Sequence, residues 1–177
     1  MNDQVVLVTE NDEAIGLMPK LEAHEKGVLH RAFSVFIFNS RNEMLLQRRA
    51  FGKYHSEGLW SNTCCSHPFP GEAVHEGAVR RLREEMGIEA DLKFLYTFRY
   101  RADLENGLTE HELDHVFYGV SDETPVIDPA EVSDYKYLTM PEIEADIAQN
   151  PHVYTEWFKI CMPVIARKLE PGNNETF

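Results

Sequence analysis

The stretch SNTCCSHPFPGE, residues 61–72, places a thiol and an imidazole two residues apart. Side chains alternate along an extended segment, so Cys65 and His67 share one face while Cys64 and Ser66 point the other way. The chain has three cysteines, two of them adjacent, which indicates free thiols in a reducing compartment rather than a disulfide scheme. Cys65 and His67 are therefore candidates for one site.

A second stretch, TEHELDHV at residues 109–116, carries acidic side chains at every second position. In an extended segment this spacing places Glu110 and Glu112 on one face. Asp114 shares that face, and the sequence alone does not exclude it as a ligand.

A third stretch, EAHEKGVLHRAF at residues 22–33, offers His24 and His30. Together with His67, these residues supply three imidazoles. With Glu110 and Glu112 they make a possible set of five metal ligands. Such a set suits a divalent transition metal better than the all-oxygen site that calcium prefers. The residues form one site only if the fold brings the three segments together.

The segment from residue 66 to residue 88 carries charged residues and a glycine at regular spacing. They are Glu72, Arg80, Glu84, Glu85 and Gly87. This arrangement resembles the Nudix box, in which the carboxylates of a helix hold divalent cations against a diphosphate.

Two identities depart from the Nudix pattern. Ser66 stands where the family has glycine, and Arg81 stands where it has the first glutamate of the helix. Arg81 weakens the carboxylate cluster and adds a side chain that can bind phosphate. This substitution favours binding of a diphosphate over its hydrolysis. The alternative is that Arg81 forms only a surface ion pair with Glu85, four residues away on the same helical face.

The elements that must position these residues form a mixed pattern. Strand-like alternation or apolar runs occur in residues 4–8 and 14–18, in residues 30–49 as two strands around a turn, in residues 91–103 and 109–120, and after a loop in the last part of residues 126–138. Helical spacing occurs in residues 72–88, 141–149 and 154–169. Ser40 to Asn42 is a turn signal. We therefore predict an α/β fold with a Nudix-type mixed β-sheet sandwiched between helices.

The 177 residues (20.4 kDa) predict a single domain spanning residues 1–177, with a polar tail from about residue 170. The net charge of −13 argues against nucleic acid or an anionic membrane surface as a partner. The N-terminus lacks the features of a signal peptide and no segment is long and apolar enough to span a bilayer, so a cytoplasmic location is expected.

Four stretches together, EAHEKGVLHRAFSVFIFN, SNTCCSHP, FRYRAD and TEHELDHVF, resemble the type 1 isopentenyl-diphosphate isomerases, Nudix-fold enzymes of isoprenoid biosynthesis. The resemblance covers roughly residues 5 to 160. It implies a metal-dependent 1,3-proton shift that converts isopentenyl diphosphate to dimethylallyl diphosphate through a carbocation, with an acid and a base on opposite faces of the substrate.

The resemblance also implies roles for individual residues. The catalytic residues are Cys65, Glu112 and Tyr100. The metal ligands are His24, His30, His67, Glu110 and Glu112, with Glu85 holding a second, diphosphate-bound Mg²⁺. The substrate contacts are Lys20, Arg49, Lys53, Arg81 and, in the C-terminal helix, Trp157. Cys64 is expected to be a packing residue.

The resemblance leaves several points open. The ion at the His/Glu site is Mn²⁺, Mg²⁺ or Zn²⁺, and either Cys65 or Glu112 is the acid in a given direction. The expected partner is a small isoprenoid diphosphate, and the chain is expected to be a monomer or a weak homodimer. The alternatives are a Nudix pyrophosphohydrolase and a non-catalytic protein that binds metal and diphosphate.

Overall fold

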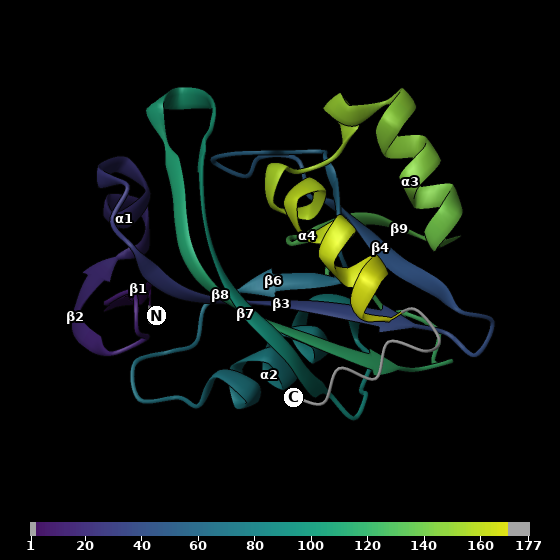
Figure 1. Cartoon of the computed structure of the whole chain (residues 1–177), viewed down its shortest axis with the longest axis horizontal. Helices are drawn as coiled ribbons and strands as arrows, with labels where there is room; N and C mark the ends of the chain where they lie inside the picture. Colours follow the sequence, from purple (N-terminus) through teal and green to yellow (C-terminus); the bar gives the residue numbers. More distant parts are fainter. Residues whose placement is uncertain (1–2, 170–177) are drawn as a thin grey trace.

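The structure, a computed structural model of the whole chain, describes residues 3–169 (Figure 1). The polar tail predicted from about residue 170 lies outside the described residues. The strands are β1 (Gln4–Val8), β2 (Ala14–Pro19), β3 (His30–Phe38), β4 (Glu43–Arg49), β5 (Trp60–Ser61), β6 (Cys64–Ser66), β7 (Lys93–Asp103), β8 (Thr109–Val120) and β9 (Val132–Thr139). The helices are α1 (Lys20–Lys26), α2 (Val74–Met86), α3 (Met140–Gln149) and α4 (Glu156–Lys168), with 3₁₀ turns at Glu105–Gly107 and Pro151–Val153.

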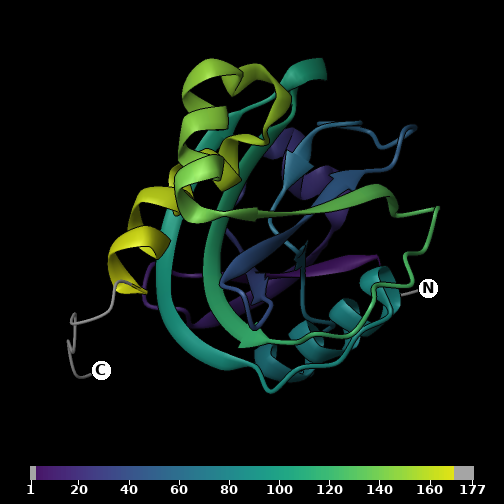
Figure 2. The same cartoon turned by 90° about the vertical axis from the view of Figure 1, so that its right-hand side faces the viewer.

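The nine strands form one mixed sheet with β3 at its centre. β3 pairs in parallel with β8 and antiparallel with β1, β4 and β6. β7 and β8 form a long curved antiparallel hairpin that runs across the molecule (Figure 2). Residues 4–8 and 14–18, which the sequence predicts as strands, pair antiparallel as β1 and β2. The sheet thus joins segments that are far apart in the sequence.

Helices cover both faces of the sheet, as the fold prediction required (Figures 1 and 2). Alternate residues of β3 divide between the two cores: Phe33, Val35 and Ile37 pack toward α2, while Phe36 and Phe38 pack toward α3 and α4. Both sides of this strand are buried, which explains why it reads as a nearly continuous apolar run.

The spacing of apolar residues in α2 correctly predicts its buried face. Ala78, Leu82 and Met86 are buried in one core, and Val74 packs against it. Burial of a leucine side chain of this kind contributes about 2 kcal/mol. Gly87 ends the helix with φ 64°, a left-handed conformation that glycine adopts without strain.

The C-terminal helix starts later than the sequence pattern suggests. Tyr154, the predicted first residue, is extended, and α4 begins at Glu156 after the N-cap residue Thr155. The Tyr154 hydroxyl donates a hydrogen bond to Asp146 of α3, so its position depends on a tertiary contact.

α1 is a short helix that the sequence pattern does not reveal. It ends at Gly27, which has φ 63°. The carbonyl oxygen of Gly27 is 2.9 Å from Nδ1 of His111 on β8 and accepts its hydrogen bond. This contact holds α1 against β8, which brings His24 toward the glutamates of that strand.

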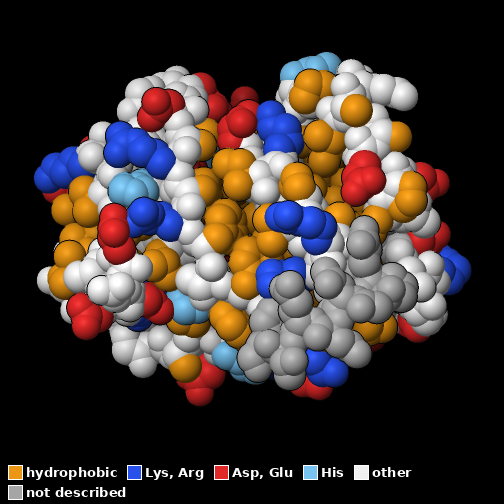
Figure 3. Space-filling model, in the orientation of Figure 1, with side chains coloured by type: hydrophobic (Ala, Val, Ile, Leu, Met, Phe, Trp, Pro, Cys, Tyr) orange, Lys and Arg blue, Asp and Glu red, His pale blue; other side chains and the backbone are white. Residues whose placement is uncertain are grey.

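The described residues include no helix that is both long and apolar enough to span a bilayer. On the face shown in Figure 3, acidic and basic side chains are interspersed around hydrophobic ones. This face therefore carries no continuous basic surface.

Candidate active site and metal centre

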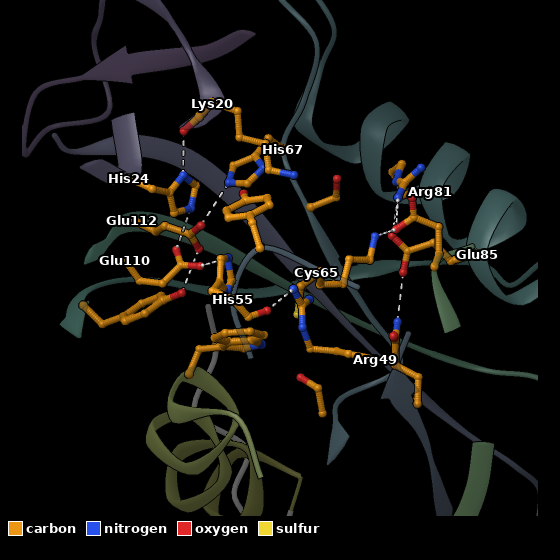
Figure 4. A pocket seen from close by; sticks show the side chains of 18 residues that line it. Lys20, His24, Arg49, His55, Cys65, His67, Arg81, Glu85, Glu110 and Glu112 are labelled. Carbon is orange, nitrogen blue, oxygen red and sulfur yellow. Dashed lines mark hydrogen bonds and ion pairs between the residues drawn. The ribbon is translucent and has the colours of Figure 1, made fainter. Parts of the chain in front are cut away.

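One cavity brings the predicted site residues together. The predicted residues that line it are Lys20, His24, Arg49, Lys53, Cys65, His67, Arg81, Glu85, Tyr100, Glu110, Glu112 and Trp157. The remaining one, His30, is fully buried and shares a group of donor atoms with His24. Figure 4 shows two sides of the cavity with Cys65 between them. Arg81 and Glu85 lie on one side, and the other carries His24, His55, His67, Glu110 and Glu112.

The imidazoles of His24 and His30 are oriented by backbone carbonyls. Nδ1 of His24 is 2.7 Å from the carbonyl oxygen of Lys20, and Nδ1 of His30 is 2.8 Å from that of Val28. A carbonyl oxygen only accepts, so each Nδ1 carries the proton and each Nε2 keeps its lone pair. Both Nε2 atoms are buried without a hydrogen-bond partner.

The glutamates of β8 face these imidazoles. Nε2 of His24 is 3.3 Å from Oε2 of Glu110, and Nε2 of His30 is 3.5 Å from Oε1 of Glu112. Nε2 of His67 lies 2.9 Å from the same Oε1 of Glu112. The parallel register of the sheet sets this arrangement, because His30 on β3 is directly opposite Glu112 on β8.

The donor set fits a divalent metal ion. Among the described residues, His24, His30, His67 and Glu112 offer donor atoms within 4.8 Å of one another. Oε2 of Glu110 is a further buried oxygen without a hydrogen-bond partner. A divalent metal ion at the centre would satisfy these otherwise unpartnered atoms.

Asp114 lies outside the groups of converging donors. Its Oδ2 accepts a 2.6 Å hydrogen bond from the hydroxyl of Ser34, and both groups are buried. This partner, rather than a metal, accounts for one oxygen of the Asp114 carboxylate.

Burial controls protonation in the cluster. It lowers the pKa of His67 to about 3, which keeps the imidazole neutral. It also raises the pKa of Glu110, and the nearby charge of Glu112 adds to that shift. Two carboxylates in one buried site repel each other unless a cation lies between them.

Tyr100 donates a hydrogen bond to Glu112 from the neighbouring strand. It lies on β7 directly opposite Glu112, and its hydroxyl donates a 2.9 Å hydrogen bond to Oε2. Burial, followed by the negative charge of Glu112, raises the pKa of the Tyr100 phenol, so the hydroxyl stays protonated.

The two adjacent cysteines lie on opposite sides of β6, as alternation predicts. Cys64 is fully buried in the core under α2. Cys65 lines the cavity, and its Sγ donates to Oδ1 of Asn62 at 2.9 Å and lies 3.5 Å from the hydroxyl of Ser34. Burial, and then the carboxylate of Asp114, raise the pKa of the Cys65 thiol, so it holds its proton.

Basic side chains reach the cavity from several elements. Arg49 at the end of β4 donates hydrogen bonds to the carbonyl oxygens of Ser56 (3.1 Å) and His55 (3.3 Å). Its guanidinium lies over the ring of Trp157, 5.2 Å from the centroid. Burial, and then the charge of Lys53, lower the pKa of Lys20.

Arg81 and Glu85 do form the ion pair that the sequence left as an alternative, at 2.5 Å. The pair is not a surface pair, because Glu85 is buried. Oε2 of Glu85 also accepts a 2.9 Å hydrogen bond from Gln47, and Arg81 lies 3.4 Å from Glu131. Lys53 pairs with Glu131 too.

Sequence reasoning missed several residues that line the cavity. They are Gln47, Tyr54, His55, Ser61, Ser66 and Glu131. Alternation along β4 could have identified Gln47, which shares a face with Arg49. His55 and Glu131 lie in loops, where no periodicity indicates which way a side chain points.

Comparison with known proteins identifies the family. The NUDIX domain family matches residues 28–158. The chain is 50% identical over 162 residues to Isopentenyl-diphosphate Delta-isomerase 2 of Aromatoleum aromaticum, covering 92% of this chain and 86% of that protein. It is 55% identical over 157 residues to Isopentenyl-diphosphate Delta-isomerase of Pectobacterium atrosepticum, covering 89% and 88%.

Solved structures with this fold are more distant in sequence. DR0079 of Deinococcus radiodurans superposes with a TM-score of 0.73 at 22% identity, covering 89% of this chain and 96% of that one. The MutT protein of Methanosarcina mazei gives a TM-score of 0.67 at 18% identity, covering 81% and 96%. The sheet, the cavity and these relatives agree, and the chain belongs to the isopentenyl-diphosphate Delta-isomerase family, within the Nudix fold.

Proposed function

We propose that this chain interconverts isopentenyl diphosphate and dimethylallyl diphosphate. The observation that carries the proposal is that Cys65 and Glu112, from β6 and β8, line one cavity together with four basic side chains. Relatives at about half identity bear the isomerase name. A thiol that holds its proton and a carboxylate, within reach of one small substrate, meet the requirements of a proton shift.

The reaction adds one proton and removes another. An unactivated alkene is a weak base, so an acid must protonate the terminal carbon C4, which leaves a tertiary carbocation at C3. A base then removes a proton from C2, and the electrons of that C–H bond form the C2=C3 double bond. The diphosphate takes no part in bond making or breaking.

We assign the two proton transfers to Cys65 and Glu112. Because the reaction is reversible, each is the acid in one direction and the base in the other. Tyr100 holds Glu112 by its 2.9 Å hydrogen bond and supplies a protonated hydroxyl beside it. Trp157 lies against the cavity, where the face of its ring can stabilise the carbocation by about 2 kcal/mol in a dry site.

A divalent ion held by the His/Glu cluster belongs to the proposal. His24, His30, His67, Glu110 and Glu112 would hold it. When bound, it offsets the charge of the buried carboxylates and fixes the orientation of Glu112. Which ion fills the centre, Mn²⁺, Mg²⁺ or Zn²⁺, remains a prediction open to metal analysis.

The basic residues would bind the diphosphate. Lys20, Arg49, Lys53 and Arg81 line the wall of the cavity. Glu85 at the same wall would share a Mg²⁺ ion with the diphosphate. Glu85 is paired with Arg81, so this pair would have to rearrange for Arg81 to bind the diphosphate while Glu85 holds Mg²⁺.

A pyrophosphohydrolase activity is less well supported. Hydrolysis in the Nudix manner uses a cluster of helical carboxylates to hold metal ions. Arg81 occupies one of those positions and neutralises the neighbouring Glu85.

The decisive experiment is proton NMR of the purified protein with isopentenyl diphosphate and Mg²⁺ in deuterated water. We expect dimethylallyl signals with deuterium incorporated into carbon. Release of phosphate would indicate a hydrolase, and unchanged substrate after metal repletion would indicate a binding protein. Either result would overturn the proposal.

A cytoplasmic location, a single domain, a monomer or weak homodimer, and the absence of nucleic-acid and membrane partners remain predictions from the sequence. Cell fractionation and light scattering of the purified chain test the first and third of these directly.

A further inference from the structure

We infer that His55 is an additional ligand of the metal centre, through Nε2, so that the centre holds four imidazoles. The inference rests on the centre proposed above and concerns a residue that the sequence pattern did not identify. His55 lies in the loop between β4 and β5 and is only 4% exposed. It lines the same cavity as His24, His67, Glu110 and Glu112 (Figure 4).

The distances place His55 beside two of the predicted metal ligands, His24 and Glu110. Nε2 of His55 is 3.3 Å from Oε1 of Glu110, and Nε2 of His24 is 3.3 Å from the other oxygen, Oε2. The three residues offer donor atoms that all lie within 4.8 Å of one another. Adjacent ligands of an octahedral ion with bonds of about 2.1 Å are about 3.0 Å apart, and opposite ligands about 4.2 Å apart.

This second group of donors is continuous with the first. His24 belongs to both groups, whereas His55 belongs to the second alone, so one ion with four imidazoles requires His55 to move slightly toward the first group. The rings of His24 and His55 stack with centroids 5.5 Å apart and an angle of 28°, so their edges can face the same side. One ion bound by His24 is therefore within reach of His55.

The loop holds His55 in place without using Nε2. Its Nδ1 lies 3.2 Å from the hydroxyl of Ser56, and its carbonyl oxygen accepts a hydrogen bond from Arg49. The edge of its ring meets Trp157 with centroids 5.9 Å apart. A buried imidazole that is oriented through its other nitrogen is the usual condition of a metal-binding histidine.

A fourth imidazole changes which ion the centre prefers. Imidazole nitrogen suits zinc, cobalt, nickel and iron, whereas Mg²⁺ prefers oxygen and keeps its waters. We therefore expect the His/Glu centre to select a divalent transition metal strongly over Mg²⁺. Mg²⁺ would be left to the diphosphate.

The test uses the full-length protein and Co²⁺ alone. The wild type, His55→Phe and His55→Ala are stripped of metal and titrated with Co²⁺, and X-ray absorption at the cobalt edge counts the imidazoles. His55→Phe keeps a ring of similar size for the contacts with His24 and Trp157, which guards against a variant that fails to fold. His152→Ala, an exposed histidine in the 3₁₀ turn before α4, is the matched control.

We expect four imidazoles per cobalt in the wild type and three in His55→Phe. The Co²⁺ affinity of both His55 variants should fall at least tenfold. Loss of a group that only orients a ligand already costs about 10- to 100-fold in metal affinity, and loss of a ligand should cost no less. The affinity of His152→Ala should be unchanged.

Three imidazoles in the wild type would overturn the inference and leave the rest of the centre intact. An unchanged cobalt affinity in His55→Phe would do the same. Failure to bind Co²⁺ at all in the wild type would overturn the metal centre too. Isomerase activity, measured separately by NMR, tells these outcomes apart from failure of the proposed function.

Discussion

Glu112 is the residue on which most contacts of the site converge. His67 and Tyr100 each lie 2.9 Å from it, on different oxygens, and His30 lies 3.5 Å away. Its neighbours on both adjacent strands, His30 on β3 and Tyr100 on β7, are set opposite it by the register of the sheet. A carboxylate fixed on this many sides has little freedom to rotate, which suits a base that must meet one carbon of a small substrate.

Replacing Tyr100 with phenylalanine tests this arrangement. We expect kcat to fall about 10- to 100-fold, because Glu112 loses the donor that orients Oε2. Metal affinity should change less than kcat, since the ion is held by other groups. Steady-state kinetics and Co²⁺ titration measure the two quantities.

Tyr96→Phe is the matched control, because Tyr96 lies on the same strand and its hydroxyl faces Cys161 of α4 instead of Glu112. Near-normal kcat in Tyr100→Phe would remove Tyr100 from the proposed mechanism.

The two adjacent cysteines provide an internal comparison. Cys65→Ala should lower kcat by roughly 10²- to 10⁴-fold, the usual contribution of a proton-transfer group. Cys64→Ala, one residue away on the opposite side of β6, should keep near-normal kcat and lose only stability. The measurement compares the initial rates of the two variants per folded molecule, and circular dichroism checks that each variant is folded. Equal rates in the two variants would argue that Cys65 has no chemical role.

At the scale of elements, α2 shows how one helix serves both the core and the site. Leu82 and Met86 face the core, while Arg81 and Glu85 reach the cavity wall. Arg81 is held between Glu85 (2.5 Å) and Glu131 (3.4 Å). Although burial opposes the charged form, Glu85 raises the pKa of Arg81, so the guanidinium stays charged.

Arg81→Ala should therefore affect both stability and substrate binding. Leaving Glu85 buried without its partner costs about 3 kcal/mol. We also expect KM for the diphosphate substrate to rise more than kcat falls. Urea denaturation and steady-state kinetics measure the two effects.

Arg83→Ala is the matched control, because Arg83 is on the same helix but its side chain is 74% exposed. It should change neither the free energy of unfolding nor KM. A stability for Arg81→Ala equal to that of Arg83→Ala would show that Gln47 alone suffices to stabilise the Glu85 carboxylate.

Helices and strands with a regular hydrophobic pattern were predicted well from the sequence, whereas the short helix α1 was missed. The four-residue spacing in α2 and the alternation in β8 determine which residues face which side, so Glu110 and Glu112 were placed together correctly. α1 has only seven residues and no clear period, and Tyr154 is held extended by a contact with α3. Whether His24 would meet Glu110 depended on the pairing of strands, which a single sequence does not encode locally.

At the scale of the whole molecule, the charge is arranged unevenly. The chain carries a net charge of −13, yet four basic side chains line one cavity. The overall field attracts divalent cations and opposes the approach of a diphosphate, so affinity for the substrate must come from close contacts in the cavity.

The proposed metal centre would join α1, β3, β8 and His67, the residue that follows β6, so metal binding should stabilise the whole fold. At an ion concentration of 100 times Kd the free energy of unfolding should rise by about 2.7 kcal/mol. This corresponds to roughly 5–10 °C in Tm for a chain of this size. Calorimetry with and without Co²⁺ measures the shift.

In Glu110→Gln the shift should be much smaller, whereas Glu144→Gln, on the exposed side of α3, should keep the full shift. A full shift in Glu110→Gln would remove Glu110 from the set of ligands.

The parallel pairing of β3 with β8 has a consequence for how the protein is made. His24 and His30 are synthesised early, but Glu110 and Glu112 emerge from the ribosome only after more than half of the chain. Contacts between such distant segments form slowly, because a long loop must close first. The nascent chain thus presents the histidines without the glutamates, and an ion at the proposed centre would find its full set of ligands only when translation has passed β8.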